Sequence, residues 1–67
     1  MKHRAKVYEE KRLKGYEDFE FLCDAVQYCN THSGKGDHCE VVEVHRSLTG
    51  YEEYGTIAAW DYKAEYV

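Results

Sequence analysis

Apolar and polar residues alternate over residues 3–9, and this alternation predicts a β-strand. Ala5 and Val7 point to one side of the strand. The other side carries Arg4, Lys6 and Tyr8. One face of the sheet that contains this strand is therefore expected to be apolar and the other to be basic and aromatic.

An apolar stripe at helical spacing predicts an amphipathic helix over residues 18–32. The stripe consists of Phe19, Leu22, Val26 and Cys29. We expect Asp18 to cap the start of the helix and Gly34 to close its end. Residues 10–16, which are mostly polar and include Gly15, are interpreted as a connection between the strand and the helix.

Two further strands are predicted over residues 39–47 and 53–62, joined as a hairpin at Thr49 and Gly50. A two-residue turn there would place Arg46 opposite Glu53, so that opposite charges meet, and would pair Glu40 with Ala59 and Cys39 with Trp60. It would also bring apolar residues of the two strands to the face that carries Ala5 and Val7. These residues are Val42, Val44, Ile57 and Ala59.

The predicted order is β-α-β-β, which makes the chain a single α+β domain over residues 1–67. One helix would pack on a three-stranded, mainly antiparallel sheet. A right-handed crossover would make the first two strands parallel if they share a sheet, and the third strand could then lie between them. The sequence leaves the strand order open.

The sheet face away from the helix is expected to hold a cluster of aromatic rings. They are Tyr8, Tyr54, Trp60 and Tyr62. Tyr and Trp anchor many protein interfaces, so an exposed cluster of them favours a binding surface. The alternative is that the rings pack on one another as a second small core.

Charge is distributed unevenly along the chain, which has a net charge of −4. Residues 1–14 hold six cations and two acids, whereas the remainder holds three cations and eleven acids. The acids expected beside the aromatic cluster are Glu43, Glu52, Glu53 and Asp61. Rings and carboxylates together suit a basic groove on a partner protein, such as one that normally holds nucleic acid.

A second hypothesis is a single-stranded nucleic-acid-binding domain, because aromatic rings and cations on a sheet can stack bases and bind phosphates. Its residues would be Arg4, Lys6, Lys11 and Arg12, together with the same rings. The isoelectric point of about 5.5 opposes this hypothesis, since phosphate binding favours a basic surface.

A third hypothesis is a zinc-stabilised structural domain. Its ligands would be Cys29, His32, His38 and Cys39. This spacing is not that of a standard zinc finger, and buried cysteines are also ordinary core residues. The leading interpretation therefore includes no metal and no other cofactor.

Enzymatic activity is not predicted, because no nucleophile-base pair or phosphate-binding loop is found and so short a chain has little room for a substrate pocket. No apolar run is long enough for a membrane span, and no secretory signal is recognised. We therefore expect the cytoplasm, where three cysteines would stay reduced.

The format of the chain resembles small phage-encoded host-takeover proteins, including anti-CRISPR inhibitors. The resemblance rests on the length of 67 residues, the β-α-β-β order, the net acidity and the Tyr/Glu-rich segment from Tyr51 to Tyr62. It implies a stoichiometric inhibitor of a nucleic-acid-handling complex in a host cell. A homodimer formed through the aromatic face is compatible with this and with the other two hypotheses.

Overall fold

The computed structural model describes residues 2–61 and contains one helix and one antiparallel sheet. The elements are β1 (Lys2–Glu9), β2 (Arg12–Phe19), α1 (Leu22–His32), β3 (His38–Ser47) and β4 (Gly50–Asp61). The sheet has four strands in the order β2-β1-β3-β4. The α+β class is confirmed, whereas the prediction of three strands is wrong. The first predicted strand is antiparallel to its neighbour β3, and all three strand pairs within residues 2–61 are antiparallel.

The additional strand, β2, lies at an edge of the sheet and pairs with β1. A tight turn at Glu10 and Lys11 reverses the chain, and both residues adopt positive φ angles of 49° and 69°. Such a turn normally selects Asn and Gly, so Glu and Lys gave no turn signal. Because most of β2 is polar and exposed, it also lacks the apolar alternation of a half-buried strand.

The helix begins at Leu22 rather than near Asp18, because Asp18 belongs to β2. The capping position is occupied by Phe21, which has no polar side-chain group to satisfy the first N–H groups. After the helix, the backbone N–H of Gly34 donates a 2.8 Å hydrogen bond to the Asp37 carboxylate. Lys14 of β2 binds the same carboxylate at 3.0 Å, although Asp37 is only 3% exposed. This contact ties β2 to the loop that follows α1.

The main core lies between α1 and one face of the sheet. It is formed by Ala5, Val7, Ala25, Cys29, Cys39 and Val41, with Trp60 packed against it. The register pairs Ala5 with Val41 and Val7 with Cys39, so these residues share the face that the helix covers. The prediction that Val42 and Val44 face the helix together with Ala5 and Val7 is wrong.

The other face of β3 is also apolar, since Val42 and Val44 are buried there. They pair with Arg4 and Lys2 of β1, whose long aliphatic stems lie on the same face. Because β3 has valines at consecutive positions, both of its faces are apolar. The alternation of apolar and polar residues therefore did not show which face of β3 the helix covers.

The β3–β4 hairpin follows the predicted register only at its open end, where Cys39 pairs with Trp60 and Glu40 with Ala59. The register then shifts twice, once before Val42 and once after Glu43 of β3. These shifts leave Ile57 and Tyr54 without a partner in β3. The turn consequently lies at Leu48 and Thr49. Such β-bulges bend a strand and increase its twist.

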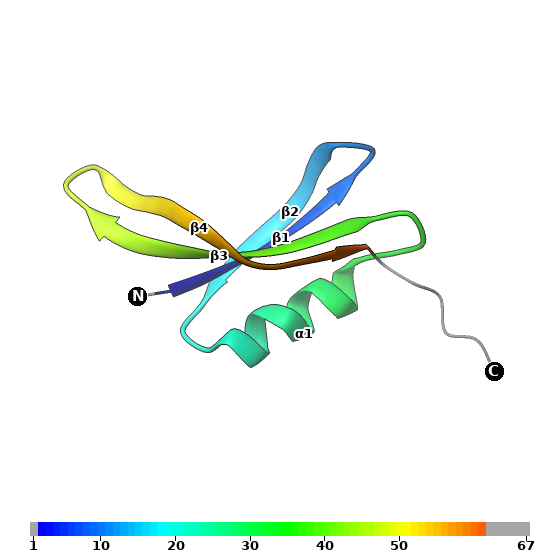
Figure 1. Ribbon diagram of the computed structural model, residues 1–67, viewed down its shortest axis with the longest axis horizontal. Coiled ribbons are helices and arrows are strands. Elements are labelled where there is room, and N and C mark those ends of the chain that lie inside the picture. The colour runs from blue at the N-terminus through cyan, green and yellow to red at the C-terminus, as the bar shows by residue number, and fades with distance from the viewer. Residues whose placement is uncertain (1, 62–67) are drawn as a thin grey trace.

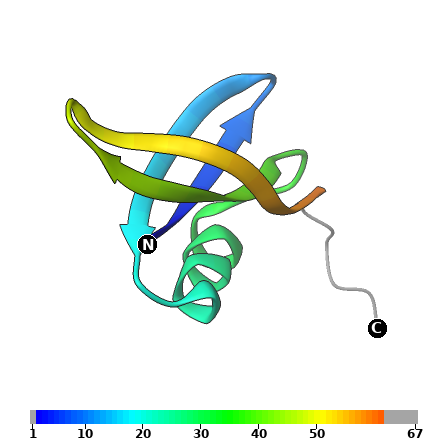
Figure 2. The same ribbon diagram turned by 60° about the vertical axis from the view of Figure 1, so that its left-hand side comes forward.

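The two hairpins diverge from a common crossing point, so that the molecule is elongated, with extents of 47 × 23 × 15 Å (Figures 1 and 2). The helix lies beneath the crossing and contacts β1, β2 and β3. The tip of the β3–β4 hairpin therefore projects beyond the part of the sheet that the helix covers (Figure 1).

We predict that Val7→Ala lowers the free energy of unfolding by about 2 kcal/mol, because it deletes buried methyl groups and leaves a cavity. Urea denaturation would measure the change. The matched control is Ile57→Thr, which keeps a β-branched side chain at an exposed position and should change stability by less than about 0.5 kcal/mol. Equal losses in the two variants would contradict this placement of the core.

A second prediction concerns the turn between β1 and β2. Replacing Glu10 by Asn and Lys11 by Gly should raise the free energy of unfolding by about 1 kcal/mol, because these residues adopt positive φ at lower cost. Thermal and urea unfolding would report it. A double variant that is no more stable than the parent would show that the turn carries no strain.

Candidate protein-binding surface

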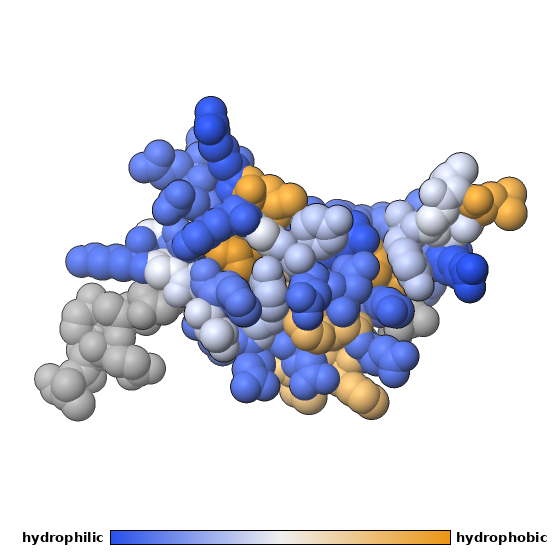
Figure 3. Space-filling model, turned by 180° about the vertical axis from the view of Figure 1, so that it is seen from behind, coloured by the Kyte–Doolittle hydropathy of each residue, from blue (hydrophilic) through white to orange (hydrophobic). Residues whose placement is uncertain are grey.

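Large apolar side chains are exposed along β4 and its turn on both faces of the β3–β4 hairpin, since Tyr54 stacks on His45 whereas Tyr51 lies beneath Lys2 on the other face. We call this the β4 surface and define it by Leu48, Tyr51, Glu52, Tyr54 and Ile57, all of which are exposed. The space-filling view shows hydrophobic side chains as separate patches among hydrophilic ones, with one patch at the tip of this hairpin (Figure 3). The arrangement leaves apolar area available for contact with another molecule.

Tyr54 is held in a defined position although its side chain is largely exposed. Its ring stacks on His45, with centroids 4.3 Å apart and an angle of 27° between the planes. The Nε2 atom of His45 is in turn 2.6 Å from a carboxylate oxygen of Glu43. Tyr54 remains 67% exposed despite this support. A ring that is already oriented loses less conformational freedom when a partner binds.

Glu53 has a different role from the one predicted for it. Its carboxylate binds Lys6 through two contacts of 3.1 Å and Arg4 through one of 3.3 Å. Burial opposes the charge, but the hydrogen bonds and charges of Lys6 and Arg4 outweigh it and lower the pKa of Glu53. This carboxylate therefore joins β4 to β1 within the molecule and is not free for a partner.

Arg4 also binds Asp18 of β2, through Nε at 2.8 Å and Nη2 at 3.1 Å. The hydrogen bond to Asp18 raises the pKa of Arg4 further above its usual range. The cations proposed for nucleic-acid binding on β1, Arg4 and Lys6, are thus already neutralised by carboxylates. Their side chains are only 18% and 14% exposed.

Trp60 lies on the helix side of the sheet rather than on the uncovered side. It is half-buried, pairs with Cys39 and packs against the main core. The prediction of its face is wrong, because β3 turns Cys39 and Val41 toward the helix rather than Val42 and Val44, and Trp60 lies on the same side as its partner Cys39. Tyr62, the other aromatic anchor expected near this end, falls outside the described residues.

Asp61 is the acid that the structure places at the far end of β4. It accepts a 2.7 Å hydrogen bond from Nδ1 of His38, whose Nε2 is 3.3 Å from Glu40. The hydrogen bond to Asp61 is the main cause that raises the pKa of His38. Tyr8 is half-buried beside this group, with its ring centroid 6.2 Å from that of His38.

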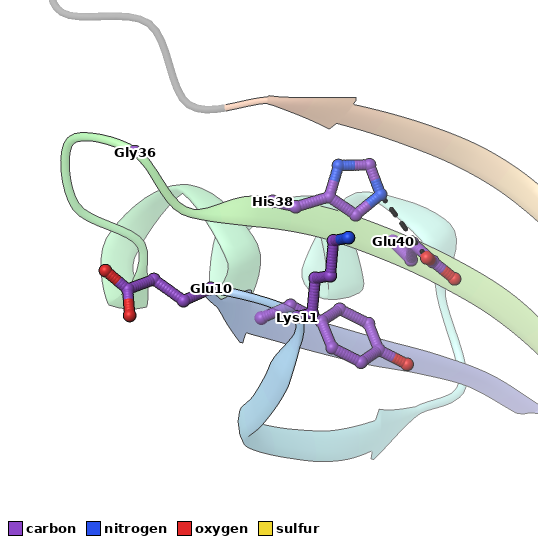
Figure 4. A pocket seen from close by; sticks show the side chains of 6 residues that line it. Glu10, Lys11, Gly36, His38 and Glu40 are labelled. Carbon is purple, nitrogen blue, oxygen red and sulfur yellow. Dashed lines mark ion pairs between the residues drawn. The ribbon is translucent and has the colours of Figure 1, made fainter.

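A hollow of about 510 Å³ lies where the β1–β2 turn approaches the start of β3. It is lined by Tyr8, Glu10, Lys11, Gly36, His38 and Glu40. The close-up shows the Lys11 side chain extending toward His38, whereas Glu10 points away (Figure 4). Because the lining carries both signs of charge, the hollow does not offer the basic surface that a phosphate group needs.

The four nucleic-acid residues of the sequence hypothesis are not gathered into one basic surface. Arg4 and Lys6 lie within the ion-pair network on β1, whereas Lys11 borders the hollow. Arg12 is exposed at the start of the β2 edge. Positive charge is therefore divided between separate parts of the molecule.

The four residues of the zinc hypothesis do not form one metal site, although Cys29 and Cys39 are neighbours in the core. Cys29 and Cys39 are buried in the core, where the Cys39 thiol donates a 3.7 Å hydrogen bond to the Cys29 carbonyl. Burial raises the pKa of Cys29 to about 12, which disfavours the thiolate that binds zinc. His32 stacks on Tyr28 instead, with ring centroids 4.1 Å apart. Within residues 2–61, no group of three or more His, Cys, Asp or Glu side chains is arranged to hold a metal ion.

Leu48, Tyr51 and Ile57 were not among the predicted site residues. Ile57 was expected beneath the helix opposite Val42, but Val42 lies on the other face of the sheet and a bulge leaves Ile57 without a partner in β3. The signal that could have located Tyr51 was its position within the same Tyr/Glu-rich segment.

Comparisons of the chain with protein-family models, with curated proteins and with solved structures found no match. The one helix within the described residues is too short and too polar to cross a membrane. Assignment of a function therefore depends on the surface itself.

We predict that the contact between His38 and Asp61 stabilises the protein more at pH 5.5 than at pH 8.5. The pKa of His38 is raised on folding, so its contribution is complete below the ordinary pKa of about 6.5 and is lost as pH rises through the higher folded value. Urea denaturation of the parent and of His38→Gln at the two pH values would measure it.

Asp61→Asn is the matched variant, since it removes the charge that His38 binds. Both variants should lose the part of the pH dependence that lies above pH 6.5. A pH dependence that is unchanged in both would show that the contact contributes nothing to folding.

Proposed function

We propose that this chain is a small, non-enzymatic protein-binding module that acts as a stoichiometric inhibitor of a nucleic-acid-handling complex. The observation that supports the proposal is the composition of the exposed strand β4. It presents Tyr51, Tyr54 and Ile57 to solvent and contains carboxylates but no Lys, Arg or His. Aromatic anchors surrounded by acids suit a basic protein surface.

The carboxylates available for such a partner are Glu52 and Asp61. Glu52 makes no ion pair within residues 2–61, and the side chain of Asp61 is 79% exposed although it binds His38. Glu43 supports His45 and, through it, Tyr54. Glu53 and Trp60 contribute to the surface indirectly, by holding β4 against the rest of the sheet.

A basic groove that normally receives nucleic acid is the kind of partner that this chemistry favours. Rings and carboxylates can occupy such a groove and exclude its substrate without any catalysis. The target would then be inactive while the complex persists, in proportion to the amount of inhibitor bound. We place this action in the cytoplasm of a host cell, as the resemblance to phage-encoded inhibitors suggests.

Direct nucleic-acid binding is the weaker candidate. It has Lys11 and Arg12 as exposed cations, but the ion pairs of Arg4 and Lys6 with carboxylates reduce the positive charge that phosphates would meet. An experiment that captures partners with and without nuclease separates the two functions.

The tagged chain would serve as bait in a lysate of candidate host cells, in parallel nuclease-treated and untreated samples. The proposal expects a protein that is captured in both samples at a fixed ratio to the bait and whose nucleic-acid binding is blocked in the complex. Recovery of nucleic acid alone, or of proteins that disappear after nuclease treatment, would favour the direct nucleic-acid binder instead.

We predict that Tyr54→Ala weakens binding to the captured partner by more than about 1 kcal/mol, the scale of an interface anchor. Its free energy of unfolding should change little, because the ring is mostly exposed. Leu13→Ala, at a similarly exposed position on β2, is the matched control and should leave affinity unchanged. Titration calorimetry and urea denaturation would measure both quantities.

If Tyr54→Ala binds with parental affinity, the β4 surface is not the contact site. If binding and stability fall together, Tyr54 acts by supporting the hairpin rather than by touching the partner.

A further inference from the structure

The two edges of the sheet differ sharply in charge. Four of the eight residues of β2 are charged, with cations at Arg12 and Lys14. By contrast, β4 contains a run of seven uncharged residues from Tyr54 to Trp60, in the sequence Tyr-Gly-Thr-Ile-Ala-Ala-Trp. Proteins usually protect an edge strand with charge or proline, because its free N–H and C=O groups can pair with another strand. Over this run β4 has neither.

The bulges of β4 determine which part of the edge can accept a strand. Ile57 and Tyr54 are the residues without partners in β3, and they interrupt the regular ladder. Ala58 to Asp61 keep an unbroken register with β3 and form the part of the edge that has no bulge. The small side chains of Ala58 and Ala59 would let another backbone approach closely.

The charges that flank the uncharged run restrict what can pair there. Glu52 precedes the run and Asp61 ends it, whereas the charge of Glu53, which also precedes the run, is already compensated by Lys6 and Arg4. If β4 of a second copy paired antiparallel with this strand, the acids at one end of each run would approach the acids at the other end of its partner. Like charges on facing strands are destabilising, so a second copy is disfavoured and basic flanks are favoured.

We propose that β4 binds its partner by strand addition, and that the partner contributes an extended segment with an uncharged centre and Lys or Arg at its ends. The main-chain groups of Ala58–Asp61 would pair with this segment, while the exposed side chains of Ile57 and Tyr54 contact its apolar residues. This mode of binding rests on the proposed protein-binding function and identifies the chemistry of the partner.

The first experiment is an amide hydrogen-exchange footprint of the complex with the captured partner. Exchange at the outward-facing amides within Ala58–Asp61, which belong to every second residue because the others already bond β3, should slow at least tenfold, whereas exchange in β2 should not change. A partner that is captured and blocked, yet leaves the β4 amides unprotected, would overturn strand addition while leaving the proposed function intact.

The second experiment needs no captured partner. Its probe is a synthetic nine-residue peptide with alternating threonine and valine between two pairs of lysines. Titration of the labelled peptide should give saturable binding and should slow exchange at the outward-facing amides within Ala58–Asp61. A peptide with glutamates in place of the lysines should bind at least tenfold more weakly, and one with a central proline should not slow exchange at these amides.

Ile57→Lys should weaken binding of the lysine peptide at least tenfold, because it places a cation within the uncharged run. Leu13→Lys makes the same change at an exposed site on the opposite edge and should leave binding unchanged. Urea denaturation of both variants would establish that they remain folded.

Three results would overturn the inference. The first is that the lysine peptide does not bind at millimolar concentration. The second is that the glutamate peptide binds as well as the lysine peptide. The third is that sedimentation shows a dimer of the free chain which Ile57→Lys dissociates, since a second copy would then occupy the edge.

Discussion

The pairing of β1 with β3 sets Ala5 beside Val41 and Val7 beside Cys39, and this apolar patch gives α1 a surface on which to pack. The residues that meet there are small, so the backbone of the helix lies close to the sheet. Cys29 illustrates this proximity, because its thiol lies 3.7 Å from the carbonyl of Lys6 and 3.6 Å from that of Glu40. The helix is thereby positioned against both central strands at once.

The opposite face of the sheet is held by charge rather than by a second helix. Arg4 connects Asp18 on one edge strand to Glu53 on the other, and Lys6 supports Glu53. Single exposed ion pairs contribute little to stability, but this network is partly buried and includes a bidentate contact. It keeps the curved β4 strand near β1 and so fixes the direction in which the β4 surface faces solvent.

The sequence predicted the fold where the period of hydrophobic residues was strong and unambiguous. The amphipathic stripe through Val26 and Cys29 identified the helix, and Cys39 and Trp60 were paired as they occur in the sheet. It failed at β2, where polar residues form a strand because β1 offers them a pairing edge. The sequence also failed where two assignments fitted the pattern equally well. Either of the adjacent residues Val41 and Val42 could have faced the helix.

The sequence could predict which segment of the chain carries the candidate site, but not which of its side chains face solvent. Tyr54 of the Tyr/Glu-rich segment is exposed as expected, whereas Trp60 of the same segment packs against the main core. Which of its members face solvent depends on two bulges, and no residue type specifies them. Glu53 shows a further difficulty. Its carboxylate was expected to contact a partner, but it forms ion pairs with Arg4 and Lys6 of β1, which is distant in the sequence.

The strand order has a consequence for how the chain reaches this structure. β1 with β2 and β3 with β4 are hairpins joined by tight turns, and pairings of that kind form in microseconds. The pairing of β1 with β3 joins segments that are separated by β2, α1 and their connections, so it carries the larger cost of loop closure. We therefore expect folding to be limited by the docking of two preformed hairpins, with α1 consolidating between them.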